Sequence, residues 1–258
     1  MGIVNVTPNS FSDGGRYFNL PRALEHARQM IRDGADIIDI GGESTRPGAE
    51  PVSADDELAR VLPLVEALAA ADIAVSVDTR KPEVMRQVIA AGAAMINDVN
   101  AFRAPGALEI VAAADVGVCL MHMQGEPRTM QAAPAYGNVV SEVRDFLVER
   151  AEACVAAGIP RESVVLDPGY GFGKRLAHNL ALVRDLSVFV ATGYPVLMGV
   201  SRKSSLGEIT GRTVDQRLAA SLAAGLAAVA RGARMLRVHD VRETVDALKV
   251  WNAIEHAP

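Results

Sequence analysis

Residues 36–50 read DIIDIGGESTRPGAE, a short apolar run that passes directly into a loop of glycines, a proline and polar residues. Apolar side chains on successive positions indicate a strand that is covered on both faces, as in a parallel sheet flanked by helices. The glycines and Pro47 indicate a loop, and residues 43–46 supply charges and hydrogen-bond donors that a simple connection does not need. We therefore expect this loop to bind something.

The same strand-to-loop pattern recurs along the chain, with helix-period stretches between the strands. Eight strands are expected near residues 2–6, 36–41, 74–78, 95–99, 117–123, 163–167, 195–200 and 233–239. Helices are expected over residues 21–33, 54–71, 82–91, 139–157, 214–231 and 241–254. Eight strand–helix units predict a single-domain (β/α)8 TIM barrel of the α/β class over residues 1–258. An open doubly wound sheet is the alternative, because a sequence does not show closure.

Composition narrows the class of protein. A length of 258 residues with 50% hydrophobic and 22% charged side chains fits one large globular domain. The formal charge of −5 argues against a protein that coats nucleic acid, and no apolar stretch reaches the ~20 residues that a membrane span needs. Only Cys119 and Cys154 are present, so a disulfide framework is not expected. With no basic leader at the start, we expect a cytoplasmic protein.

Polar residues stand where the predicted strands end. In a barrel of this kind the loops after the strands converge over one mouth, where the chemistry collects. A single polar residue there is explained by the chain reaching the surface, but polar residues after all eight strands favour a ligand site. The residues in question are Asn5, Asp39, Asp78, Asn97, Asp98, His122, Asp167, Ser201, Arg202, Lys203, Arg237 and His239.

Two segments near the end of the chain suggest an anion site. Arg237 and His239 are two residues apart on a strand and so share a face, which favours a phosphate as their ligand. The alternative is an arginine paired with a core aspartate and a structural histidine. The segment SRKSS, residues 201–205, is expected to open a helix, where free N–H groups and Lys203 would attract a second anionic group. Serine at this position is more often only a helix cap.

Three other side chains suggest a flat, nitrogen-rich ligand. Asp78, Asn97 and Asp167 are expected to face one interior, where carboxylates can accept paired N–H groups from a heterocycle. The segment DPGYGFGK, residues 167–174, matches neither the P-loop nor the dinucleotide fingerprint. It is interpreted as a mobile lid from which Phe172 and Lys174 project, or as a plain glycine-rich loop.

Metal ligands are few in this sequence. Cys119 and His122 lie an odd number of residues apart on one predicted strand and face opposite ways, so a transition-metal site is not expected. Mg²⁺ held mostly by substrate phosphates, with Asn5 as a protein ligand, is compatible with so few oxygens. No G-x-S-x-G elbow of a serine hydrolase occurs.

These motifs occur together in one known family. MGIVNVTPNSFSDGG, GGESTRPGAEPVS, SVDTRKPEV, IND, CLMHMQG, LDPGYGFGK, SRKSSLG and RVHDV resemble the dihydropteroate synthase family in order and separation, over essentially the whole chain. The resemblance implies a TIM barrel that joins 6-hydroxymethyl-7,8-dihydropterin diphosphate to 4-aminobenzoate, in folate biosynthesis, by a dissociative mechanism. It also implies Mg²⁺, two small-molecule substrates, a homodimer and inhibition by sulfonamides.

The resemblance also implies roles for particular residues. Asp78, Asn97, Asp167 and Lys203 would bind the pterin, and Met121 would line its ring. Arg237 and His239 would bind the pyrophosphate, and loss of Arg237 is expected to slow the reaction without unfolding the protein. Asn5 would contact Mg²⁺. The second substrate and the closing loops would involve Phe11, Thr45, Arg46, Pro47, Phe172 and Ser201.

Two departures from the family pattern and two rival functions stand beside this interpretation. Asn9 occupies a position where the family more often has Asp, and the family's hairpin before the first strand is not seen, so the natural chain is expected to be longer. A pterin-binding barrel that transfers methyl groups to a corrinoid partner would share the acidic residues but needs no pyrophosphate site. An inactive binding homologue is the second rival.

Overall fold

The chain folds around parallel strands that follow one another in sequence. The computed structural model describes residues 1–6, 19–44 and 48–257. Its strands are β1 (Gly2–Asn5), β2 (Ile38–Gly41), β3 (Val75–Asp78), β4 (Met95–Asp98), β5 (Gly117–Met121), β6 (Val164–Asp167), β7 (Leu197–Met198) and β8 (Met235–Leu236). Each predicted strand is present. The last two are shorter than expected, and β7 starts after Pro195, which has no N–H to donate.

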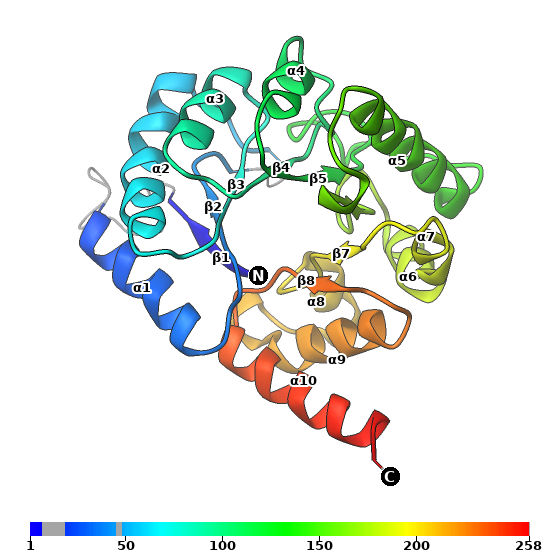
Figure 1. The fold of residues 1–258 in the computed structure, drawn as a ribbon. Coiled ribbons are helices and arrows are strands. Elements are labelled where there is room, and N and C mark those ends of the chain that lie inside the picture. The colour runs from blue at the N-terminus through cyan, green and yellow to red at the C-terminus, as the bar shows by residue number, and fades with distance from the viewer. Residues whose placement is uncertain (7–18, 45–47, 258) are drawn as a thin grey trace.

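Backbone pairing arranges these strands as a ring. Strands β1 to β6 form one parallel sheet in chain order, and β7 pairs with β8 in a second. Two isolated parallel bridges connect the sheets, one between Leu166 and Val196 and one between Gly2 and Val238. The amide of Ile3 also donates to the Val238 carbonyl at 2.9 Å. These contacts confirm the predicted (β/α)8 barrel, with the strands inside and the helices around them (Figure 1).

Helices follow the strands and cover the outside of the ring. They are α1 (Leu20–Arg32), α2 (Ala54–Ala69), α3 (Pro82–Ala90), α4 (Ala107–Ala112), α5 (Val139–Ala156), α6 (Leu176–Arg184), α7 (Ser187–Val190), α8 (Ser204–Thr210), α9 (Leu218–Val229) and α10 (Val241–Glu255). The predicted helix 214–231 is divided into a 3-10 turn, Val214–Gln216, and α9. None of the described helices is long and apolar enough to cross a membrane.

Sequence pattern explains these helices locally. In α1, the Asn19 side chain accepts the Arg22 amide, and Pro21 stands in the first turn, where its missing N–H costs nothing. Ala23, Ala27 and Met30 are spaced by four and three residues and form the buried face. The other face remains polar, so α1 lies on the barrel with one side in water.

The strands separate two hydrophobic clusters. Side chains that point outward from the strands join the helices in one large core. The alternate side chains point into the barrel, where its lower part is filled by Met1, Ile37, Met95, Cys119, Val165, Leu197 and Met235. The barrel is therefore closed below by apolar residues, and only the upper inward positions remain for a ligand.

Candidate active site

Register across the sheet brings the predicted polar residues to one level of the barrel. Asn5 pairs with Gly41, Gly41 with Asp78, and Asp78 with Asn97. Met121 pairs with Asp167 on the opposite side of the ring. Residues in register on neighbouring parallel strands share a face, so these side chains line one mouth above the apolar plug.

Arg237 lies at the centre of this level, between two carboxylates. Its Nε donates to Oδ2 of Asp39 at 2.6 Å, and its Nη2 lies 2.6 Å from the same oxygen. Nη2 also donates to Oδ2 of Asp78 at 2.9 Å. In this structure Arg237 is therefore paired with aspartates inside the barrel, which is the alternative to a phosphate ligand that the sequence left open.

Charge and burial act against each other in this cluster. Burial raises the pKa of Asp78, Arg237 lowers it, and the nearby carboxylate of Asp39 raises it further. Burial alone would lower the pKa of Arg237, but Asp39 and Asp78 raise it above its ordinary value. The guanidinium therefore stays charged, and it is the group that allows two carboxylates to occupy the barrel.

Asn97 and Asp167 are the other acceptors at this level. Asn97 is buried, and its Oδ1 has no hydrogen-bond partner among the described residues. Asp167 is also buried, and its Oδ1 accepts the Gly169 amide at 2.8 Å. Burial raises the pKa of Asp167, while the Gly169 amide, Lys203 and Arg237 lower it. Lys203 and Arg237 therefore lie near enough to Asp167 for their charges to act on it.

An apolar wall stands beside these acceptors. Met121 is buried in a cluster with Val99, Met123 and Met130, against which Phe172 packs. The ammonium of Lys203 lies 4.1 Å from the centre of the Phe172 ring, in the range of a cation–π contact. Flat apolar surface and a cation therefore lie next to the carboxylates.

His239 contacts Ser201 rather than an acid. The Ser201 Oγ accepts the backbone N–H of His239 at 3.2 Å and lies 3.0 Å from the ring Nδ1. The Ser201 hydroxyl can donate its proton to Nδ1, and in that tautomer the ring proton lies on Nε2. Burial lowers the pKa of His239 to about 4, and Arg202 and Arg237 lower it too. His239 is therefore a neutral donor in the free protein.

The loop after β6 is organised by a buried lysine. Lys174 was expected to project from a mobile lid, but its side chain is buried, so that expectation is wrong. Its Nζ donates to the carbonyls of Gly169 (2.9 Å), Phe172 (3.0 Å) and His122 (3.2 Å). Burial and Lys174 lower the pKa of His122 to about 3, so the imidazole is neutral, and its Nδ1 lies 3.0 Å from Nζ. The lysine ties the loop to the end of β5.

Gly169 gives this loop a testable requirement. Its φ is +70°, and an added Cβ would lie 1.9 Å from the His122 carbonyl oxygen. We expect Gly169→Ala to lower the free energy of unfolding by about 2–5 kcal/mol through strain and overlap. Gly158→Ala is the matched control, because Gly158 has φ +102° but open space around its Cβ position. Equal losses for both variants in urea unfolding would contradict this account.

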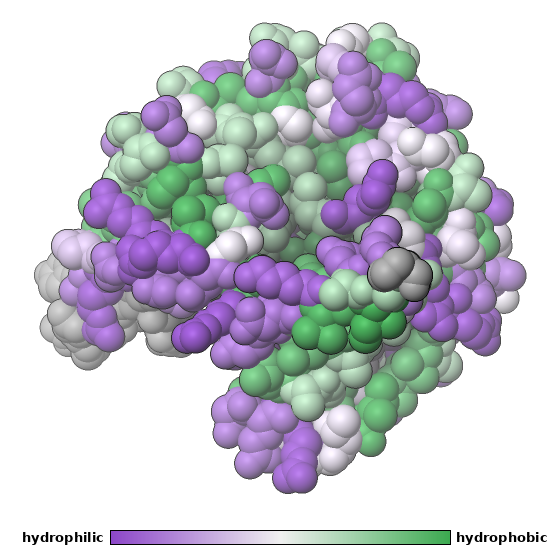
Figure 2. Space-filling view, turned by 60° about the horizontal axis from the view of Figure 1, so that its bottom comes forward, coloured by the Kyte–Doolittle hydropathy of each residue, from purple (hydrophilic) through white to green (hydrophobic). Residues whose placement is uncertain are grey.

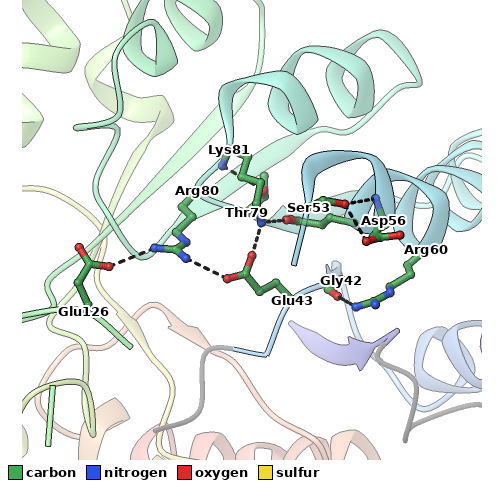
Figure 3. A network of polar contacts seen from close by, with 10 residues as sticks. Gly42, Glu43, Ser53, Asp56, Arg60, Thr79, Arg80, Lys81 and Glu126 are labelled. Carbon is green, nitrogen blue, oxygen red and sulfur yellow. Dashed lines mark hydrogen bonds and ion pairs between the residues drawn. The ribbon is translucent and has the colours of Figure 1, made fainter. Parts of the chain in front are cut away.

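A second network fixes the base of the loop after β2 (Figure 3). Lys81 contacts the carboxylates of Glu43 and Glu57, and Arg80 donates to Glu43 at 3.0 Å. Arg80 also reaches Glu126, in the loop after β5, at 3.2 Å. Loops after three strands are thereby tied together at the edge of the mouth.

Removal of Lys81 is expected to destabilise the protein. Glu57 is only 1% exposed, so Lys81→Met leaves a buried carboxylate without its counter-ion, at a cost of about 3–5 kcal/mol. Arg32→Met is the control, because its ion pair with Glu25 is 53% and 65% exposed and contributes less than ~1 kcal/mol. Denaturant unfolding measures both variants. If Lys81→Met is no more costly than Arg32→Met, the network does not stabilise this loop.

Magnesium was predicted to contact Asn5, and the donor chemistry is compatible with this. Asn5 is half-buried at the end of β1, and its amide oxygen faces Gly41, where an added Cβ would lie 3.5 Å away. Within the described part of the chain no group of three or more His, Cys, Asp or Glu could hold a metal ion. One neutral oxygen suits an ion whose other ligands are phosphates and water.

Some predicted residues lie outside the described part of the chain, and one important residue was not predicted. Phe11, Thr45, Arg46 and Pro47 fall in the ranges that the structure does not describe, as does Asn9. Asp39 was noted at a strand end but was given no role. Its signal in the sequence is a carboxylate inside an apolar run, two residues before the inward-facing Gly41.

Comparison with known proteins identifies the family of this chain. Residues 1–239 match the family model described as "Pterin binding enzyme". The chain is 53% identical to dihydropteroate synthase of Neisseria meningitidis serogroup B over 261 residues, covering 98% of this chain and 92% of that protein.

Two solved structures show the same fold. Yersinia pestis dihydropteroate synthase with a sulfonamide drug has a TM-score of 0.94 and 49% identity, covering 99% of this chain and 94% of its own. The Xanthomonas albilineans enzyme in complex with 7,8-dihydropteroate has a TM-score of 0.90 and 50% identity, covering 100% and 93%. The chain described here therefore belongs to the dihydropteroate synthase family of pterin-binding enzymes.

Proposed function

We propose that this transferase condenses 6-hydroxymethyl-7,8-dihydropterin diphosphate with 4-aminobenzoate, giving 7,8-dihydropteroate and pyrophosphate. The observation that carries the proposal is the set of acceptors at the barrel mouth, the buried Asn97 and Asp167 and the half-buried Asp78, beside the cation Arg237. The Asn97 amide oxygen lacks a partner among the described residues, and a buried acceptor of this kind costs free energy until a donor arrives.

The pterin ring supplies the donors that this level of the barrel lacks. Asp167 accepts paired N–H groups of the ring, and Asn97 binds a neighbouring edge through its amide. Asp78 accepts a further ring N–H, while Met121 packs against the ring face. Lys203 donates to a ring acceptor from the start of α8. Charge-assisted hydrogen bonds to carboxylates in a dry site are the strong ones.

Pyrophosphate leaves toward the cationic side of the mouth. Arg237 donates to its oxygens, and the Nε2–H of the neutral His239 does the same, with Ser201 fixing the ring orientation. An anion bound there raises the pKa of His239, so the imidazole gains a proton more readily as negative charge accumulates. These donors stabilise charge that forms only in the transition state, which is why they accelerate the reaction.

Bond breaking precedes bond making in the proposed mechanism. The C–O bond between the pterin methylene and the diphosphate breaks, and both electrons leave with pyrophosphate. The positive charge on the methylene spreads into the ring, where Asp167 and Asp78 stabilise it. The amine of 4-aminobenzoate then attacks the methylene and loses one proton to solvent. An aromatic amine needs no general base once this cation exists.

Mg²⁺, when bound, neutralises charge on the diphosphate oxygens. Asn5 would hold it on the protein side, because its amide oxygen lies at the end of β1 within the same mouth. Phe172 and Ser201, together with the undescribed residues Phe11, Thr45, Arg46 and Pro47, would bind 4-aminobenzoate. Sulfonamides resemble this substrate, and we expect them to compete with it.

The apolar outer face of the last helices supports a homodimer. Helix α9 is apolar around its circumference, yet Leu218 is exposed, and so are Ile209, Val214, Val250 and Ile254 on neighbouring elements. Figure 2 shows apolar surface gathered where α9 and α10 come forward. Such a face is typical of an interface, and sedimentation equilibrium of the purified chain tests it. The two free, buried cysteines support a reducing, cytoplasmic location.

Release of pyrophosphate measures the proposed function directly. Purified protein with the dihydropterin diphosphate and Mg²⁺ should release pyrophosphate at a rate that requires 4-aminobenzoate and should form 7,8-dihydropteroate in equal amount. A methyltransferase barrel or an inactive binding homologue would bind pterin without forming either product. Absence of both products with a correctly folded protein would overturn the proposal.

A further inference from the structure

Asp39 lies in the barrel interior without a role in the mechanism above. It faces inward on β2 in register with Ser76, two residues before Gly41, which is in register with Asp78. Its side chain is 0% exposed, compared with 12% for Asp78. Asp39 is thus too deep for the substrate, yet an unpaired carboxylate at this depth would be costly.

Arg237 makes one hydrogen bond to each carboxylate, but its guanidinium lies closer to Asp39. Both Nε and Nη2 contact Asp39, each at 2.6 Å, whereas Asp78 receives only Nη2, at 2.9 Å. No hydrogen bond or ion pair to Nη1 comes from the described residues. Two short contacts from a planar guanidinium to one oxygen fix its position more firmly than a single longer one. The pair with Asp78 is therefore the one that a ligand can displace.

A conflict exists between this pairing and substrate binding. Oδ2 of Asp78 is not free to accept a hydrogen bond from the pterin ring while Nη2 of Arg237 donates to it. If Arg237 had no other partner, the buried guanidinium would stay on Asp78 and compete with the ring. Because the Asp39 carboxylate contacts the guanidinium from below, Arg237 keeps a partner when Asp78 turns to the pterin. Its Nη1 and Nη2 are then available to the diphosphate.

We propose that Asp39 is a positioning residue, which retains Arg237 when the pterin takes Asp78 and thereby aims the guanidinium at the departing pyrophosphate. This role rests on the proposed function, since it requires a pterin at Asp78. Asp39 touches neither substrate and acts only through Arg237. The second oxygen of Asp39 and the hydroxyl of Ser76, its neighbour in register, have no partner among the described residues, so Asp39 has no other evident structural bond to satisfy.

Binding of a pterin without a diphosphate separates this role from ordinary transition-state binding. The probe is 6-hydroxymethylpterin, which Arg237 does not need to contact. In Asp39→Asn, Arg237 should settle on Asp78, so the affinity for this probe should fall by roughly tenfold or more, and kcat should fall as well. Ser76→Ala is the matched control: it removes a buried hydroxyl from the same layer and should change neither value by more than about twofold.

A double-mutant cycle with Arg237→Ala identifies the mechanism. Without Arg237 nothing competes for Asp78, so adding Asp39→Asn should leave the affinity for 6-hydroxymethylpterin unchanged. A merely structural role of Asp39 would give the same loss in both backgrounds, and that result would overturn the proposal. Probe affinity in Asp39→Asn within about twofold of the wild type would overturn it too.

A measurement on the wild-type protein keeps the proposal testable if Asp39→Asn fails to fold. The Nε–H of Arg237, assigned by comparison with Arg237→Lys, should exchange slowly with water both before and after 6-hydroxymethylpterin is added. Rapid exchange in the complex would show that Asp39 has released the guanidinium, against the proposal. Wild-type protein that forms no dihydropteroate refutes the proposed function instead, so the two failures are distinguishable.

Discussion

Arg237→Ala is expected to lower kcat for pyrophosphate release by roughly 100-fold, and to destabilise the fold as well. The loss of rate follows from one or two charge-assisted hydrogen bonds to the leaving group, each contributing about 1.5–3 kcal/mol, where 1.4 kcal/mol is a factor of ten. The loss of stability follows from Asp39 and Asp78, which share this guanidinium.

The stability effect differs from the expectation based on sequence. Sequence motifs suggested that Arg237 serves only the leaving group, so that its loss would leave the fold intact. The structure places it between the buried carboxylate of Asp39 and the half-buried carboxylate of Asp78, and leaving a buried carboxylate without its counter-ion costs about 3–5 kcal/mol. Burial already raises the pKa of Asp78, so at low pH this carboxylate takes up a proton and the loss of Arg237 costs less stability.

Denaturant unfolding and steady-state kinetics at a temperature where the variant is folded measure the two effects separately. Arg234→Ala is the control, because Arg234 lies just before β8 and is exposed. It should change neither stability nor rate beyond ~0.5 kcal/mol. Unchanged stability of Arg237→Ala would mean that Asp39 and Asp78 do not depend on this cation.

Asp167→Asn is expected to reduce kcat/KM for the dihydropterin diphosphate by roughly 1000-fold. A carboxylate accepts two parallel N–H groups from the ring, whereas an amide presents its own NH₂ to one of them and leaves two donors facing each other. Sites that match a substrate's hydrogen bonds lose about 10⁴-fold or more when such a pair is broken, so this value is conservative.

Stability should respond differently from activity in this variant. Burial raises the pKa of Asp167 above the ordinary value of 3.8, so the folded protein binds this proton more tightly than the unfolded chain. The contribution of Asp167 to stability is therefore greatest at low pH and declines as the pH rises above 3.8. Asp167→Asn removes this decline, and its unfolding free energy near neutral pH should equal or exceed that of the wild type.

Asp98→Asn is the matched control for Asp167→Asn. Asp98 also ends a strand, but its oxygens accept the amides of Asn100 and Phe102, each at 2.7 Å, on the side of the wall away from the site. The Asp98→Asn variant should be less stable than the wild type and should keep the wild-type affinity for the pterin. A loss of affinity in Asp98→Asn as large as that in Asp167→Asn would contradict the assignment of Asp167 to the ring.

Local sequence was sufficient to predict the barrel and much of its mouth. Short strand-like runs between helix-period stretches mark the eight strands, and the alternation of side chains predicted that Arg237 and His239 share a face. Asp78 and Asn97 were expected to face one interior, and they lie in register on neighbouring strands. These features depend only on strand periodicity and strand order, both of which a sequence carries.

Contacts between distant segments could not be predicted in this way. The sequence gives no sign that Lys174 folds back under its own loop, because its burial depends on carbonyls at the end of β5. The pairing of Lys81 with Glu57 depends on how α2 and α3 pack. Asp39 and Arg237 are 198 residues apart and meet only because the ring closes. Such ion pairs follow from tertiary packing, after the pattern of strands is fixed.

A crystal structure of the protein with 6-hydroxymethylpterin diphosphate tests the central claim most directly. The account predicts the ring edge within hydrogen-bond distance of Asp167 and Asn97, with the diphosphate of the same molecule against Arg237 and His239. It would be contradicted by a ring bound in the groove between α5 and α6, lined by Tyr136 and Arg144, or by a ring in the barrel whose diphosphate does not reach Arg237.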